Sequence, residues 1–223
     1  MNIKLFFEAI IKFILGVVII GLLIFVPANT INYWNGWLFM GILFIPMFIA
    51  GIFMMVKSPD LLRKRLNAKE KENEQKQVVK LSGLMFLIGF IIAGLNYRYN
   101  WTTIPNLVII ISSVMFILAY ILYAEVLREN EYLSRTIEVQ ENQKVVDTGL
   151  YGIVRHPMYA ITILLFLTMP LILGSIISFV IFLIYPFIIA KRIKNEEEVL
   201  ERELNGYSDY KNKVKYKLIP FIW

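Results

Sequence analysis

The chain has 223 residues, of which 58% are hydrophobic and 18% are charged, and its formal net charge is +6. This composition is too apolar for a soluble domain and predicts an integral membrane protein. The absence of cysteine excludes disulfides, zinc–thiolate sites and thiol nucleophiles, and with a single histidine no metal site is expected. Nucleic acid is not an expected partner, because no basic run is interleaved with aromatic residues.

The first half of the chain contains four apolar runs, each predicted to cross the membrane as a helix. They extend over Leu5–Val26, Trp34–Val56, Leu81–Leu95 and Leu107–Tyr123. A transmembrane helix needs about 20 apolar residues. The third run is therefore short unless it extends into Val78 and Val79.

The second half of the chain is expected to hold a short apolar hairpin. A polar linker, Arg128–Thr148, precedes two apolar runs, Tyr159–Leu173 and Ser175–Ala190, which Gly174 joins. Each run has about 15 residues, below the roughly 20 that cross a bilayer squarely. The last helix is expected to continue beyond Ala190 as an amphipathic helix in the cytoplasm.

The basic residues predict the orientation. If the spans alternate, Arg98 is the one Lys or Arg on the far side of the membrane, and the loop Lys57–Lys80, both termini and the second half's polar segments lie in the cytoplasm. The sequence thus predicts an all-α polytopic integral membrane protein with about six membrane segments, the last two a short hairpin, plus a C-terminal cytoplasmic amphipathic helix. Residues 1–127 are expected to form the four-span N-terminal part, and residues 128–223 a second part that contains the hairpin and the C-terminal helix.

The only histidine stands in an unusual stretch, residues 149–159, which reads Gly-Leu-Tyr-Gly-Ile-Val-Arg-His-Pro-Met-Tyr. Pro157 favours a helix start, because the first helical position needs no backbone N–H donor. The positive end of that helix dipole would then lie beside Arg155, His156 and Tyr159, a ready anion site at the membrane edge. Taken singly, each residue also fits an ordinary role: a packed histidine, an interfacial tyrosine or a positive-inside arginine.

Charged residues also flank an apolar face on the last helix. At about 100° per residue, Glu196 and Glu197 fall at the two edges of the face that contains Ile193, and Arg192 stands one turn before Glu196. Carboxylates beside an apolar stripe need a partner. The alternative is an ordinary surface pair between Arg192 and Glu196, which would contribute a few tenths of a kcal/mol.

Two blocks together resemble the signature of a known family. The first is the Gly-x-Tyr-x-x-x-Arg-His-Pro-x-Tyr pattern of residues 149–159, and the second comprises Glu196-Glu197-x-x-Leu200, Tyr207-x-x-Tyr210, Val214 and Pro220. Over roughly residues 125–223 the chain resembles the integral-membrane methyltransferases of the isoprenylcysteine carboxyl methyltransferase type, with phospholipid N-methyltransferases as relatives. Membrane sterol reductases are distantly similar in the C-terminal part, so a reductase stays an alternative.

The resemblance implies that residues 128–223 form the cofactor-binding and catalytic region, with S-adenosylmethionine as the cofactor and a set of residues around it. Arg192 would face the substrate, and Glu197 is the second candidate catalytic residue. The residues implied in cofactor binding are Gln140, Gln143, Lys144, Val145, Val146, Tyr151, His156, Pro157, Met158, Tyr159 and Glu196. No metal ligand is implied.

The expected activity is methyl transfer to a lipophilic small-molecule or lipid-modified acceptor in the bilayer, foremost to a carboxylate. A carboxylate is already ionised and needs only an arginine to align it, whereas an amine must first lose a proton, for which His156 or Glu197 would be the base. Phospholipid N-methylation is the alternative reaction, and a non-catalytic membrane binding or transport protein with a degenerate pocket is the alternative class. The Lys-, Asn- and Ile-rich composition suggests a bacterial cytoplasmic membrane.

Overall fold

The computed structural model describes residues 3–67, 73–133, 136 and 139–223, and the regular secondary structure of these residues is helical throughout. The all-α fold predicted from the sequence is thus confirmed. The helices are α1 (Ile3–Ala28), α2 (Trp34–Lys57), α3 (Pro59–Leu66), α4 (Asn73–Tyr99), α5 (Asn106–Glu129), the short 3₁₀ helix η1 (Gly149–Gly152), α6 (Pro157–Ile172), α7 (Ile176–Phe182), α8 (Tyr185–Glu203) and α9 (Tyr207–Lys213).

The prediction of a polytopic integral membrane protein is also confirmed. Within the described residues, five helical stretches are long and apolar enough to cross a membrane: α1, α2, the part Gln75–Tyr99 of α4, α5, and the stretch Ile176–Glu203 that α7 and α8 form together. The apolar helix α6 is shorter, with 16 residues. The third run gains its length because α4 begins well before Val78.

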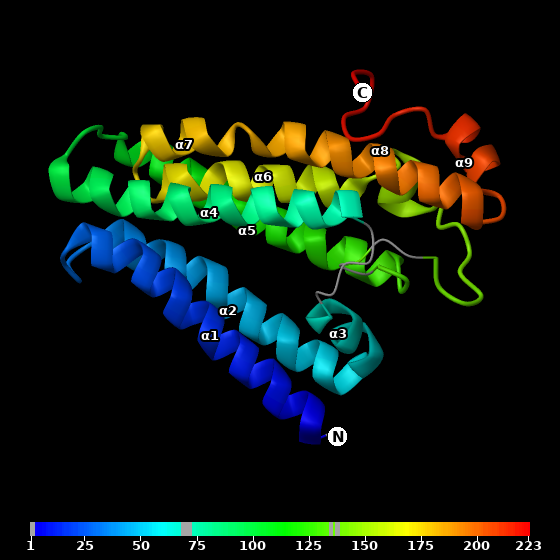
Figure 1. Ribbon diagram of the computed structural model, residues 1–223, viewed down its shortest axis with the longest axis horizontal. Coiled ribbons are helices and arrows are strands. Elements are labelled where there is room, and N and C mark those ends of the chain that lie inside the picture. The colour runs from blue at the N-terminus through cyan, green and yellow to red at the C-terminus, as the bar shows by residue number, and fades with distance from the viewer. Residues whose placement is uncertain (1–2, 68–72, 134–135, 137–138) are drawn as a thin grey trace.

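The helices form a bundle from which one hairpin diverges. In Figure 1, α4, α5, α6 and the α7–α8 stretch run side by side, and contacts join α5 to α6 and α4 to both α7 and α8. The α1–α2 hairpin approaches α4 near the α4–α5 connection and diverges from the bundle toward α3 (Figure 1). The end near α3 also carries η1, the start of α6, and α9.

Polar groups close the turn between α6 and α7. Gly174 has a φ of +77°, a left-handed conformation that glycine adopts without steric cost. The last carbonyls of α6 lack partners within the helix, and the start of α2 supplies them: Tyr33 Oη donates to Leu173 O, and Asn35 Nδ2 donates to Ile172 O at 2.9 Å. These bonds matter because an unsatisfied carbonyl is costly in an apolar surrounding.

The apolar run expected over Ser175–Ala190 is not one helix. α7 ends at Phe182, and α8 begins at Tyr185 with Pro186 in its first turn. Because proline has no N–H to donate back along the chain, a helix start is favoured at this point. α8 then continues to Glu203, as the amphipathic pattern beyond Ala190 predicts.

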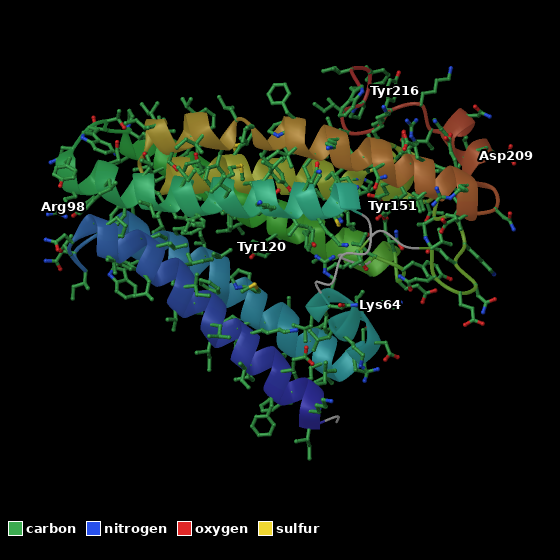
Figure 2. The ribbon with its side chains drawn as sticks, viewed as in Figure 1. Lys64, Arg98, Tyr120, Tyr151, Asp209 and Tyr216 are labelled. Carbon is green, nitrogen blue, oxygen red and sulfur yellow. The ribbon has the colours of Figure 1, made fainter. Side chains whose placement is uncertain are left out.

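The charged residues gather at one end of the molecule. Figure 2 shows Arg98 at one end of the bundle, and Lys64, Tyr151 and Asp209 toward the other. α3 is attached to this second end, since Lys64 Nζ donates to Glu131 O at 3.2 Å. Of the loop Lys57–Lys80, for which a cytoplasmic location is predicted, residues 68–72 lie outside the described residues.

Candidate functional site

The glycine that begins the first motif allows a side chain to cap η1. Gly149 has a φ of +52°, and a Cβ atom there would lie 1.4 Å from Glu129 Oε1. That carboxylate accepts a hydrogen bond from the Leu150 N–H at 3.0 Å. The motif is thereby tied to the end of α5, and only a residue without a side chain leaves room for the contact.

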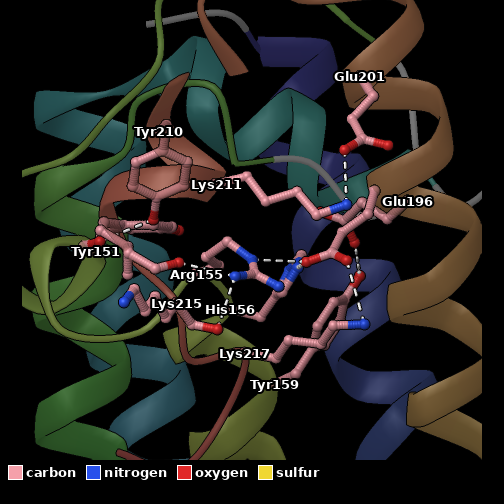
Figure 3. A network of polar contacts seen from close by, with 12 residues as sticks. Tyr151, Arg155, His156, Tyr159, Glu196, Glu201, Tyr210, Lys211, Lys215 and Lys217 are labelled. Atoms are coloured by element: carbon pink, nitrogen blue, oxygen red, sulfur yellow. Dashed lines mark hydrogen bonds and ion pairs between the residues drawn. The ribbon is translucent and has the colours of Figure 1, made fainter. Parts of the chain in front are cut away.

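The C-terminal segment after α9 lies along the end of the motif. The Arg155 N–H donates to Tyr216 O and the His156 N–H donates to Lys217 O, both at 2.9 Å. The Arg155 guanidinium also donates to the carbonyls of Val214 at 2.7 Å and Lys215 at 2.9 Å (Figure 3). The backbone just before α6 is therefore held by the segment Val214–Lys217, which comes long after it in the chain.

Glu197 binds this same corner from α8. Its carboxylate contacts Arg155 Nε at 2.8 Å, His156 Nε2 at 3.2 Å and Lys217 Nζ at 3.2 Å. The Glu197 side chain is only 5% exposed. A buried carboxylate needs such partners, and removing one partner of a buried charge is strongly destabilising. Glu197 therefore fastens α8 to the motif, and its predicted catalytic role stays a prediction.

A second polar group joins α6 to α8 on the other side of the histidine. The Tyr159 hydroxyl donates to Glu196 Oε2 and accepts a hydrogen bond from Arg192 Nε at 2.8 Å (Figure 3 labels Tyr159 and Glu196). The Tyr159 and His156 rings are stacked, with centroids 5.7 Å apart. Arg192 is 8% exposed. The Tyr159 hydroxyl thus contacts both Arg192 and Glu196, the two residues for which an ordinary surface pair was the alternative.

These groups open onto one cavity at the charged end of the bundle. Its walls come from the segment after α5, from the motif and the start of α6, and from α8 and α9. The described residues that line it are Asn130, Tyr132, Leu133, Thr136, Gln143, Lys144, Val145, Val146, Tyr151, Arg155, His156, Met158, Tyr159, Arg192, Glu196, Leu200, Leu204, Tyr207 and Tyr210.

Most residues that the sequence comparison implies therefore line one cavity, including Arg192 and Glu196. Three predicted site residues, Gln140, Pro157 and Glu197, are outside this set. The Gln140 N–H donates to Gln143 Oε1 at 2.9 Å, and Gln140 Nε2 donates to Tyr132 O at 2.5 Å, so Gln140 shapes the lining segment. Pro157 is the first residue of α6, as predicted.

Several lining residues were not predicted as site residues. Tyr207, Tyr210 and Leu200 stand in the C-terminal motif block, so their presence there was the available signal. Asn130 carries no sequence signal, yet its Nδ2 donates to the Tyr151 hydroxyl at 3.0 Å, and thereby orients that ring.

The two tyrosines of α9 differ in their hydrogen bonding. Tyr210 Oη donates to the Tyr151 carbonyl at 2.7 Å, and burial raises the pKa of Tyr210, which keeps it a neutral donor. Tyr207 is 3% exposed, and among the described residues its hydroxyl has no hydrogen-bond partner. Burial also raises the pKa of Tyr207. A buried hydroxyl without a partner is costly, and the Tyr207 hydroxyl in the cavity wall is available to a polar group that enters the cavity.

Comparison with known proteins gives a family match over part of the chain. Residues 108–202 match the isoprenylcysteine carboxyl methyltransferase (ICMT) family, which confirms the resemblance predicted from the two motif blocks. The match covers most of α5, the motif, α6, α7 and nearly all of α8. No curated protein matches the chain significantly. The family match and the apolar helices together support a membrane methyltransferase.

Proposed function

We propose that this protein uses S-adenosylmethionine to methylate the carboxylate of a lipophilic acceptor at the cytoplasmic face of a membrane. One observation carries the proposal. Arg192 and Glu196, a cation and an anion one turn apart on α8, both contact the Tyr159 hydroxyl in the wall of a cavity at the end of an apolar bundle. In this pair the Arg192 cation is available to the acceptor carboxylate, and the Glu196 anion is available to the cofactor.

The residues of the cavity fit the polar groups of S-adenosylmethionine. The Glu196 carboxylate suits its ammonium group, and the start of α6, a helix of 16 residues, suits its carboxylate. Val145, Val146 and Met158 supply apolar wall for the adenine ring. The unpartnered Tyr207 hydroxyl suits a further ligand oxygen or nitrogen.

The chain's own residues have little covalent chemistry to perform. When bound, S-adenosylmethionine supplies a methyl group on a positively charged sulfur, so the protein has only to bind, align and desolvate the reactants. Arg192 would bind the acceptor carboxylate through its guanidinium and direct one oxygen to the methyl carbon. A carboxylate oxygen that accepted the methyl group as the sulfur gave it up would become a methyl ester, and no residue of the chain would need to take up a proton.

Arg192 also distinguishes a carboxylate from an amine acceptor. A buried guanidinium attracts a carboxylate and repels a protonated amine. The arrangement therefore favours esterification over N-methylation. A lipophilic acceptor would reach this end of the bundle from the bilayer, while the polar cofactor would enter from water.

The cytoplasmic location of the cavity rests on charge. Arg98 lies at the end of the bundle opposite the end that carries Lys64 and α9 (Figure 2), and most Lys and Arg residues belong to segments at the cavity end. Positive charge is enriched in cytoplasmic loops. This distribution supports a cofactor site on the cytoplasmic side.

Transfer of a labelled methyl group into a total membrane lipid extract tests the proposal. The purified protein should label a lipophilic product, and mild base should release the label as methanol, because esters hydrolyse and methylamines do not. Base-stable label would instead support N-methylation. A protein that neither transfers label nor binds S-adenosylhomocysteine in calorimetry would refute the proposed function.

A further inference from the structure

A buried glutamine from the N-terminal half of the chain contacts the candidate acceptor arginine. Gln75, near the start of α4, is 0% exposed. Its Oε1 accepts a hydrogen bond from an Arg192 terminal nitrogen at 2.9 Å, and its Nε2 donates to Asn195 Oδ1 at 2.6 Å. Because Arg192 and Asn195 are three residues apart on α8, the single amide of Gln75 holds one turn of that helix.

The arginine is thereby held from two sides by two different helices. Tyr159 on α6 accepts from Arg192 Nε at 2.8 Å, and Gln75 on α4 accepts from the terminal nitrogen at 2.9 Å. Two bonds to a planar group fix both its position and the orientation of its plane, which matters for fork-like binding of a carboxylate. A neutral amide does this without adding a negative charge beside the guanidinium.

We propose that Gln75 is a positioning residue that orients Arg192 for the acceptor carboxylate. The proposal rests on the proposed function, because it assigns Gln75 to the acceptor part of the same site. Gln75 precedes residues 108–202, so the family match does not supply this role. It follows from the packing of α4 against α8.

Three variants test the proposal: Gln75→Ala, Gln75→Glu and, as a matched control, Gln77→Ala. Gln77 is exposed on the same helix turn, and its side chain accepts from Lys191 at 3.2 Å. Methyl transfer is measured at increasing concentrations of the membrane lipid extract, and S-adenosylhomocysteine affinity is measured separately. Gln75→Ala should raise the apparent KM for the extract about tenfold, with kcat and S-adenosylhomocysteine affinity changed less than threefold.

The Gln75→Glu variant separates positioning from a merely structural link between α4 and α8. The carboxylate that it introduces would still accept from Arg192, and the Asn195 amide can rotate to donate to it, so a structural role predicts near-normal activity. Positioning for a carboxylate predicts the reverse, because an added negative charge competes for the guanidinium. Gln75→Glu should therefore raise the apparent KM more than Gln75→Ala does.

The outcomes are distinct. If Gln75→Glu is as active as wild type, or if kcat and S-adenosylhomocysteine affinity fall together with thermal stability, Gln75 only joins the helices and the inference is overturned. A control Gln77→Ala that behaves like Gln75→Ala would overturn it as well. Wild-type protein that transfers no label would overturn the proposed function, and this inference with it.

Discussion

Replacement of Arg192 by lysine is the most direct test of how the site treats its acceptor. The guanidinium donates hydrogen bonds in different directions, from Nε to Tyr159 and from a terminal nitrogen to Gln75. Lysine keeps the positive charge but presents it as a single ammonium group on a flexible stem. It cannot reproduce both bonds and also offer a planar fork to a carboxylate.

The size of the expected loss follows from the bond that lysine cannot make. A hydrogen bond to a charged group contributes about 1.5–3 kcal/mol, and about 1.4 kcal/mol corresponds to a tenfold change in rate. We therefore expect Arg192→Lys to lower methyl transfer about 10- to 100-fold. Glu196→Gln, which removes the charge for the cofactor ammonium, should weaken S-adenosylhomocysteine binding first.

Initial rates of base-labile methyl transfer and calorimetric S-adenosylhomocysteine affinity, measured on both variants, give the comparison. Arg202→Lys serves as a control, because Arg202 lies exposed on the same helix and pairs with Glu203. Arg192→Lys should leave the cofactor affinity within about threefold of wild type. Equal losses of rate and affinity in Arg192→Lys and Glu196→Gln would show that the two residues act only as a structural pair.

Three further predictions concern the cavity wall, the motif glycine and the orientation in the membrane. Tyr207→Phe removes a hydroxyl that has no partner among the described residues. It should therefore lower S-adenosylhomocysteine affinity about three- to tenfold without lowering the melting temperature. A lower melting temperature at normal affinity would contradict the assignment. Gly149→Ala should destabilise the protein by about 1–3 kcal/mol in detergent, because the added Cβ collides with the Glu129 carboxylate. The loss should be smaller in a Glu129→Ala background, and additive effects of the two substitutions would argue against the collision. On this cysteine-free chain, Thr103→Cys should react with an impermeant thiol reagent added to intact cells and Asp60→Cys should not, and the reverse pattern would invert the proposed topology.

The apolar runs predicted most of the helices because the membrane leaves so few alternatives. A segment in hydrocarbon must satisfy its own backbone, so a long apolar run is helical almost regardless of its detailed sequence. That argument does not locate helix ends in polar sequence. α4 begins at Asn73, within a charged segment, and the break between Phe182 and Tyr185 depends on one proline.

The same distinction applies to the site. His156 and Tyr159 belong to the first short motif block, and Glu196 belongs to the second. A local sequence pattern is therefore enough to reveal them. Gln75 and Arg192 are 117 residues apart, and their contact depends on how α4 packs against α8, which no periodicity in either segment encodes. The predicted division at residue 127 likewise falls inside α5, so the two predicted parts of the chain share a helix.

The two adjacent glutamates of α8 show how helix geometry separates two tasks. Consecutive residues on a helix point about 100° apart, so Glu196 and Glu197 cannot face the same partner. Glu196 lies in the cavity wall and contacts the Tyr159 hydroxyl, whereas Glu197 is buried against Arg155, His156 and Lys217. A carboxylate already bound to three basic groups has little capacity left for a ligand. Their directions on the helix therefore support the proposed role of Glu196 toward the cofactor and a role of Glu197 in holding the motif, an order that the sequence alone leaves open.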